Sequence, residues 1–283
     1  MRQPVMVGVD GSPCGRTAAR WAAREALLRS VPLRVVYVSP LAADETARLW
    51  PGFDVPLPDL AVRELAAEHP ELDIAGVRLA GAADAALLSC AAECSLLVLG
   101  VRGEGDFELP SLGSTALDVA GRHHGPTVLV PAGAVADSPA ETDADTDPEH
   151  VTLGLDPHRP SDAATDFAFT AAALREGPLH TVHAWSVPSP AARWMPYAVP
   201  SKDREQWEDH EVQRLADVLR PWQDKYERVR VVRSVVLRGR AAALVHASRS
   251  SGLVVVGRPH DRLDTAAHTL VQYAGCPVAV VPG

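Results

Sequence analysis

The sequence carries the apolar segment VMVGVD at residues 5–10 and a second version of it, VTLGLD, at residues 151–156. The offset of 146 between the two holds without a gap through the next apolar segment. Further along, LLVLG at residues 96–100 is matched by LVVVG at residues 253–257, and each half ends in a short apolar run between two prolines. Such self-similarity predicts two copies of one structural unit in tandem.

Each copy alternates short apolar segments with longer amphipathic ones. The short segments are apolar on both faces, as strands buried inside a parallel sheet are, and in the first copy they cover residues 4–9, 33–38, 72–79, 95–100 and 126–130. Helices are predicted between them, at residues 15–30, 60–69, 82–94 and 113–123. The alternation predicts an α/β, Rossmann-like fold of two tandem open five-stranded parallel sheets with helices on both faces.

An acidic segment separates the two copies. It is rich in Asp, Glu, Pro and Ala and contains a single valine, so it cannot bury enough apolar surface to fold by itself. We therefore predict a first domain at residues 1–131, a flexible linker at residues 132–149 and a second domain at residues 150–283.

Composition excludes several classes of protein. The 283 residues carry 27 basic and 36 acidic side chains, a formal net charge of −9, which argues against a general nucleic-acid binder. No stretch is long and apolar enough to span a membrane, and residues 1–5 run straight into a strand without room for a signal peptide. Cys90 and Cys94, one helical turn apart, fit either buried thiols or half of a metal site. These features predict a cytoplasmic location.

The loop after the fourth strand has the spacing of a phosphate-binding loop. Residues 100–114 read GVRGEGDFELPSLGS, which is Gly, two residues, Gly, nine residues and then Gly-Ser at the start of a predicted helix. Glycines let the backbone approach an oxygen closely, and the free amides of a helix N-terminus attract anions. On the residues alone, an ordinary glycine-rich loop between a strand and a helix remains the alternative.

This spacing resembles the ATP-binding signature of the universal stress protein family, in its tandem two-domain, UspA-like form. The segment GVDGS at residues 8–12 and the strand end VYV at residues 36–38 resemble the family as well, and the resemblance spans both halves. It implies ATP as ligand, with Mg²⁺ as a candidate companion. It also implies that Asp10 lies by the adenosine, that the Val38 backbone reads the adenine edge, and that the loop contacts phosphate and ribose. The implied binding residues are Asp10, Val38, Gly100, Arg102, Gly103, Gly113, Ser114 and Thr115.

The second half has lost this pattern. Only Gly257 remains, His260 replaces the second glycine, and His268-Thr269 is expected where Gly-Ser should stand. The segment from the first glycine to the proline before the last strand is also six residues shorter. We therefore predict that ATP binds in the first half only and that the second half is a partner domain. The two histidines fit a metal site or a pH switch, and the alternative is that they are ordinary exposed polar residues of a loop.

Catalytic signatures are missing from the sequence. It has no Gly-x4-Gly-Lys-Ser/Thr loop, no Gly-x-Ser-x-Gly elbow and no lysine before Lys202, so nothing is built for rapid phosphoryl transfer. The sequence favours a nucleotide-dependent stress sensor or regulator that acts on an unidentified protein partner. The alternatives are a nucleotide-free interaction scaffold of the same fold and a slow ATPase or autokinase.

The last strand of each half is predicted to pair with the other. Residues 127–130 and 278–281 are short and apolar, and each would leave an unpaired sheet edge. Members of the resembled family commonly dimerise through these strands. We therefore expect an intrachain pseudo-dimer, which leaves other surfaces for any further homodimer.

Overall fold

One continuous sheet of ten strands runs through both halves of the computed structural model, which describes residues 3–40, 57–101, 112–131, 147–186, 201–259 and 261–283. Within these residues the strand order is β3-β2-β1-β4-β5-β10-β9-β6-β7-β8. The strands are β1 (Val5–Gly8), β2 (Leu33–Ser39), β3 (Ile74–Ala80), β4 (Leu96–Gly100), β5 (Thr127–Val130), β6 (Asp147–Gly154), β7 (Leu179–Trp185), β8 (Val231–Leu237), β9 (Ser251–Arg258) and β10 (Val278–Pro282). The predicted α/β fold, with a five-stranded parallel sheet in each half, is confirmed.

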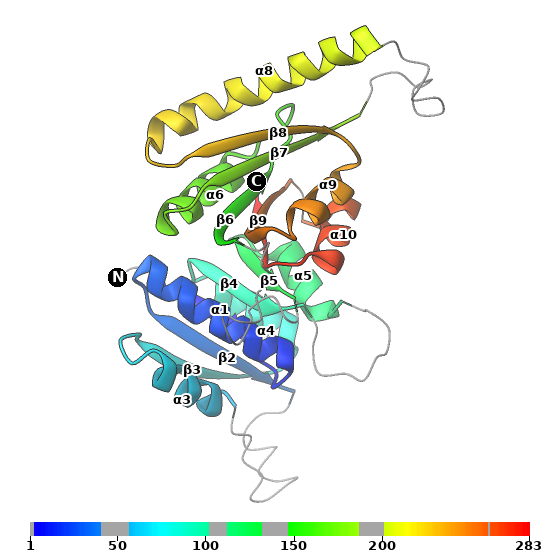
Figure 1. The fold of residues 1–283 in the computed structure, drawn as a ribbon. Coiled ribbons are helices and arrows are strands. Elements are labelled where there is room, and N and C mark those ends of the chain that lie inside the picture. Colours follow the sequence, from blue (N-terminus) through cyan, green and yellow to red (C-terminus); the bar gives the residue numbers. More distant parts are fainter. Residues whose placement is uncertain (1–2, 41–56, 102–111, 132–146, 187–200, 260) are drawn as a thin grey trace, which may run out of the picture.

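Helices cover both faces of the sheet (Figure 1). One apolar core lies under α1, α3, α6 and α8, and the other lies under α4, α5, α9 and α10. Among the described helices, none combines the length and the apolar character needed to cross a membrane. Their bounds are α1 (Pro13–Arg29), α3 (Asp59–Glu68), α4 (Ala83–Ala91), α5 (Ser114–Arg122), α6 (Asp162–Leu174), α8 (Ser201–Lys225), α9 (Arg240–Ala247) and α10 (Thr265–Tyr273).

The two halves meet through their final strands, as expected from the sequence. β5 and β10 pair antiparallel, with Leu129 opposite Val278 and Thr127 opposite Val280. All other neighbouring strands in the described sheet are parallel. The junction removes one exposed edge from each five-stranded sheet and places the halves side by side, as Figure 1 shows.

The first helix shows how local sequence sets the fold. Ser12 caps α1, because its Oγ accepts a hydrogen bond of 2.9 Å from Gly15 N, and Pro13 occupies the first turn. The helix ends at Ser30, whose φ of 52° is left-handed. Its buried face is mostly alanine, which lets the helix lie close against the strands.

A buried ionic network joins the halves. Glu25 of α1 is 1% exposed, and its carboxylate accepts hydrogen bonds from Arg29 Nε at 2.7 Å and from Arg175 Nη2 of the second half at 2.5 Å. Burial alone would raise the pKa of Glu25, but the two guanidinium groups outweigh burial and hold this pKa below its ordinary value. The Arg29 guanidinium also lies 5.1 Å from the ring centroid of Phe167 in the second half.

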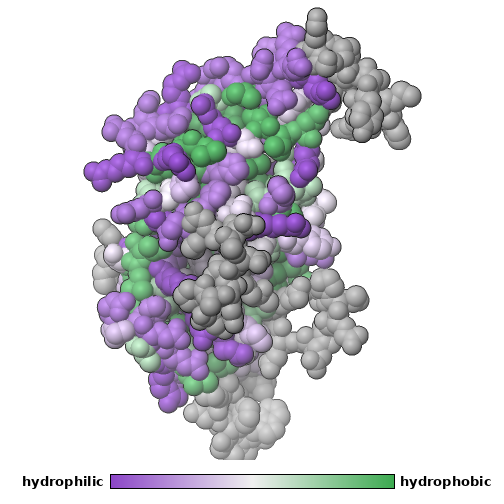
Figure 2. Space-filling model, in the orientation of Figure 1, coloured by the Kyte–Doolittle hydropathy of each residue, from purple (hydrophilic) through white to green (hydrophobic). Residues whose placement is uncertain are grey.

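The halves differ most in the helix before their third strand. In the first half this helix is α3, which has 10 residues, whereas its counterpart α8 has 25. Leu215 and Leu219 of α8 are fully buried against the sheet, while hydrophilic side chains cover its outer surface (Figure 2). Most of the predicted linker lies outside the described residues, and its last three residues belong to β6, which begins at Asp147.

Candidate functional site

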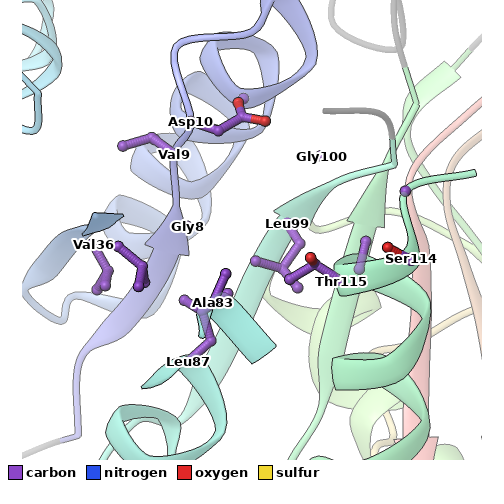
Figure 3. A pocket seen from close by; sticks show the side chains of 14 residues that line it. Gly8, Val9, Asp10, Val36, Ala83, Leu87, Leu99, Gly100, Ser114 and Thr115 are labelled. Atoms are coloured by element: carbon purple, nitrogen blue, oxygen red, sulfur yellow. The ribbon is translucent and has the colours of Figure 1, made fainter. Parts of the chain in front are cut away.

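A cleft of about 270 Å³ opens at the carboxyl ends of β1 and β4. The chain passes from β1 to β2 on one side and returns to β4 on the other, so the strand order reverses here, and ligands of open α/β sheets bind at such a point. Figure 3 shows Asp10 at the end of β1, and Ser114 and Thr115 across the cleft at the start of α5. The cleft is lined by Gly8, Val9, Asp10, Gly15, Val36, Val38, Ala83, Leu87, Leu99, Gly100, Gly113, Ser114, Thr115 and Ala116.

Most of the binding residues expected from the sequence line this one cleft. They are Asp10, Val38, Gly100, Gly113, Ser114 and Thr115, whereas Arg102 and Gly103 lie outside the described residues. The apolar wall that α4 contributes through Ala83 and Leu87 was not expected from the sequence. Its only sequence signal is the start of a helix directly after Gly81, at the end of β3.

The turn after β1 fixes the carboxylate of Asp10 at the rim of the cleft. Asp10 Oδ1 accepts a hydrogen bond of 2.9 Å from Ser12 N, and Gly11 between them has a φ of +88°. A Cβ at Gly15 would lie 2.8 Å from the same oxygen, so only glycine lets the helix start so close to the carboxylate. Asp10 is exposed, so its negative carboxylate lies next to the apolar wall.

The first turn of α5 forms the opposite rim and offers backbone amides. Gly113 is the N-cap residue and has no side chain that could cap the helix, while Gly113 N itself donates to Val101 O at 2.7 Å. An uncapped helix start carries free N–H groups and the positive end of the helix dipole. Ser114 and Thr115 add two hydroxyl groups at the same place. This rim is suited to an anion such as phosphate.

Gly100 has a structural role that also explains why its counterpart persists. A Cβ on Gly100 would lie 2.9 Å from the backbone carbon of Cys14 at the start of α1. In the second half, a Cβ on Gly257 would lie 2.9 Å from Cβ of Ser161, which caps α6. Both glycines are needed to pack a strand end against a helix start, so the first glycine of the loop carries no information on phosphate binding.

In the second half, a carboxylate caps the helix start that corresponds to the start of α5. Ser114 and Thr265 each begin a helix thirteen residues before the final strand, so Asp264-Thr265, not His268-Thr269, is the counterpart of Gly113-Ser114. The expected counterpart, His268-Thr269, was wrong by four residues, because all six residues that the second half lacks precede the helix. Asp264 caps α10, with Oδ1 accepting a hydrogen bond of 2.7 Å from Ala267 N.

Asp264 also forms an ion pair with an arginine. Arg240 Nη1 lies 3.1 Å from Oδ2 of Asp264 and thereby joins the starts of α9 and α10. Of the two histidines of this loop, His268 is exposed on α10, and His260 lies outside the described residues. A negative side chain at the helix start, in place of free amides, disfavours an anion.

Burial affects two of the four cysteines strongly. Burial raises the pKa of Cys94 to about 11 and the pKa of Cys276 to about 12. At neutral pH both are therefore thiols rather than thiolates, which are the nucleophilic and metal-binding form. Of the two interpretations of Cys90 and Cys94, these values favour buried thiols for Cys94.

Comparison with known proteins assigns the family. The family model described as "Universal stress protein family" matches residues 1–131 and 148–282. The chain belongs to the universal stress protein family. Among its relatives, universal stress protein Rv1996 of Mycobacterium tuberculosis is 30% identical over 318 residues, covering 98% of this chain and 94% of that protein. Universal stress protein Rv2623 of the same organism is 31% identical over 304 residues, covering 98% and 95%.

Solved structures agree on the fold of this universal stress protein. A universal stress protein from Archaeoglobus fulgidus matches 100% of this chain with 99% of its own length, at a TM-score of 0.63 and 15% sequence identity. The fold of both halves is therefore shared with a protein of low sequence identity.

Proposed function

We propose that this universal stress protein binds ATP in the cleft of its first half, one molecule per chain, and acts as a nucleotide-dependent stress sensor or regulator of a protein partner. The observation that carries the proposal is the contrast between two helix starts. The start of α5 is uncapped and lines an open cleft, whereas the start of α10 is capped by Asp264.

The chemistry of the first cleft fits an adenine nucleotide from end to end. Val36, Val38 and Leu87 offer an apolar surface for the flat base. Asp10 at the rim supplies a carboxylate that accepts hydrogen bonds from ribose hydroxyls. The amides of the first turn of α5, with the Ser114 and Thr115 hydroxyls, suit the phosphates. The apolar wall, the acceptor and the donors thus follow the order of base, ribose and phosphate.

A magnesium ion is compatible with this cleft but is not required by it. Mg²⁺ in nucleotide sites is held by phosphate oxygens, waters and one or two carboxylates. Among the described lining residues, Asp10 is the carboxylate that is present. When bound, Mg²⁺ would reduce the repulsion between the phosphates and the acidic protein.

Two aspartates at equivalent positions test the proposed site. Asp10 and Asp156 each lie two residues after the first strand of their half, and each accepts a hydrogen bond from the backbone N two residues on, at 2.9 and 3.0 Å. We expect Asp10→Ala to weaken ATP binding about 10-fold or more, because hydrogen bonds to a charged group are worth about 1.5–3 kcal/mol. Asp156→Ala perturbs an equivalent turn and leaves ATP affinity unchanged.

Calorimetric titration of both variants with ATP measures this difference. Equal affinity losses in the two variants would contradict a nucleotide site in the first half only. A wild-type protein without affinity for ATP would favour the nucleotide-free scaffold, and phosphate release over hours would favour the slow ATPase.

A further inference from the structure

Three metal-ligating side chains converge at the carboxyl end of the second half of the sheet. They come from three separate elements: His158 from the turn after β6, His183 from β7, and Glu211 from α8. One ligand atom from each lies within 4.8 Å of the others. Glu211 Oε2 is 3.0 Å from His158 Nε2 and 3.2 Å from His183 Nε2.

The backbone fixes the orientation of the buried histidine. His183 is 3% exposed, and its Nδ1 lies 3.2 Å from the carbonyl oxygen of Leu155. A carbonyl oxygen only accepts, so Nδ1 donates to it, and Nε2 is the ring atom that faces Glu211 Oε2 at 3.2 Å. An imidazole nitrogen and a carboxylate oxygen therefore converge on one point, with the imidazole held from behind by a backbone carbonyl.

The geometry and the donor set both fit a zinc-like ion. Two imidazoles and a carboxylate are a known zinc-binding set, and a second hydrogen bond from a ligating imidazole to a backbone carbonyl is its usual support. Zinc bonds of about 2.0–2.1 Å in a tetrahedral arrangement separate ligand atoms by about 3.3 Å. The separations of 3.0 and 3.2 Å from Glu211 Oε2 to the two imidazoles need little adjustment.

The site is specific to the second half and separate from the proposed nucleotide cleft. At the offset of 146, Ser12 and Tyr37 stand where His158 and His183 stand. Glu211 comes from α8, the helix that is much longer than its first-half counterpart. We propose that His158, His183 and Glu211 bind one divalent transition-metal ion of the zinc class.

In the metal-free protein, Arg214 contacts one of the proposed ligands, His158. Its Nη1 lies 2.6 Å from His158 Nδ1 and 3.1 Å from His158 Nε2, so a positive charge stands against the imidazole. Metal binding through Nε2 requires the exposed Arg214 side chain to move away. Arg214 therefore opposes the metal, and its removal has a defined direction of effect.

Zinc titration of the full chain after chelator treatment, in nucleotide-free buffer, tests the proposal. We expect uptake of one zinc per chain by calorimetry and elemental analysis. His158→Ala and Glu211→Gln should each lower zinc affinity by about 10-fold or more, as losses in a metal site commonly do. His210→Ala is the matched control, because His210 is an exposed histidine next to Glu211 on the same helix. Its affinity should equal that of the wild type.

Two further readouts keep the test independent of folding. His158 has a side chain that is 48% exposed, so its alanine variant keeps the core intact, which circular dichroism checks. Arg214→Ala should bind zinc at least as tightly as the wild type, because it removes a positive charge. No zinc uptake, unchanged affinity in His158→Ala and Glu211→Gln, or weaker binding by Arg214→Ala would overturn the proposal.

Discussion

Replacing Gly113 by valine should abolish ATP binding while the protein stays folded. Gly113 has φ and ψ of −62° and 124°, which valine adopts without strain, and its N–H keeps the hydrogen bond to Val101 O. The branched side chain, however, would stand at the uncapped start of α5, where the proposed phosphates approach the amides. Titration calorimetry should find no heat of ATP binding, and the melting temperature should stay near that of the wild type.

The control for this variant is the structurally equivalent Asp264→Val. It removes the cap of α10, so it should cost about 1 kcal/mol of stability and leave ATP affinity unchanged. Retained ATP affinity in Gly113→Val would remove the start of α5 from the site and, with it, the main support for the proposed function.

Replacing Glu25 by glutamine should destabilise the protein by about 3–5 kcal/mol. The change keeps the shape of the side chain but leaves Arg29 and Arg175 without their carboxylate, and these groups are only 15% and 6% exposed. An uncompensated buried charge is costly, because it has lost water without gaining a partner. Chemical denaturation followed by circular dichroism measures the loss.

A surface ion pair with equally short geometry serves as the control. Arg220 and Asp217 on α8 also lie 2.5 Å apart, but their side chains are 67% and 53% exposed. Asp217→Asn should cost less than about 1 kcal/mol, as exposed pairs do. Equal losses from the two variants would show that burial does not strengthen the Glu25 network.

The pH dependence of the Glu25 effect has a definite sign. The folded pKa of Glu25 lies below the unfolded value of 4.5, so its stabilisation is fully present above about pH 4.5. It is lost as the pH falls through the lower folded pKa, where the carboxylate takes up a proton. The stability difference between the wild type and Glu25→Gln should therefore shrink on acidification below pH 4.5.

Local patterns predicted most of the fold because they act over short distances. The mostly apolar segment at residues 33–38 became β2, and the helix predicted at residues 15–30 became α1. The pairing of β5 with β10 was also predictable, since two short apolar strands at sheet edges have few other ways to be covered. The length of α8 was not predicted, because its buried face is only a narrow stripe in a mostly charged segment.

The candidate sites divide in the same way. The glycine-rich loop is contiguous in sequence, so Gly113, Ser114 and Thr115 could be identified, although the alignment with the second half failed where residues are missing. His158, His183 and Glu211 are separated by 25 and 28 residues, and no spacing rule connects them before the sheet and α8 bring them together. Glu25 and Arg175, from different halves, are equally invisible to the sequence.

Calorimetric titration of the wild-type chain with ATP tests the central claim, a nucleotide site in one half only, most directly. An uncapped α5 and an α10 capped by Asp264 predict a single binding event with a stoichiometry of one ATP per chain. Two equivalent sites, or no binding at all, would contradict the account.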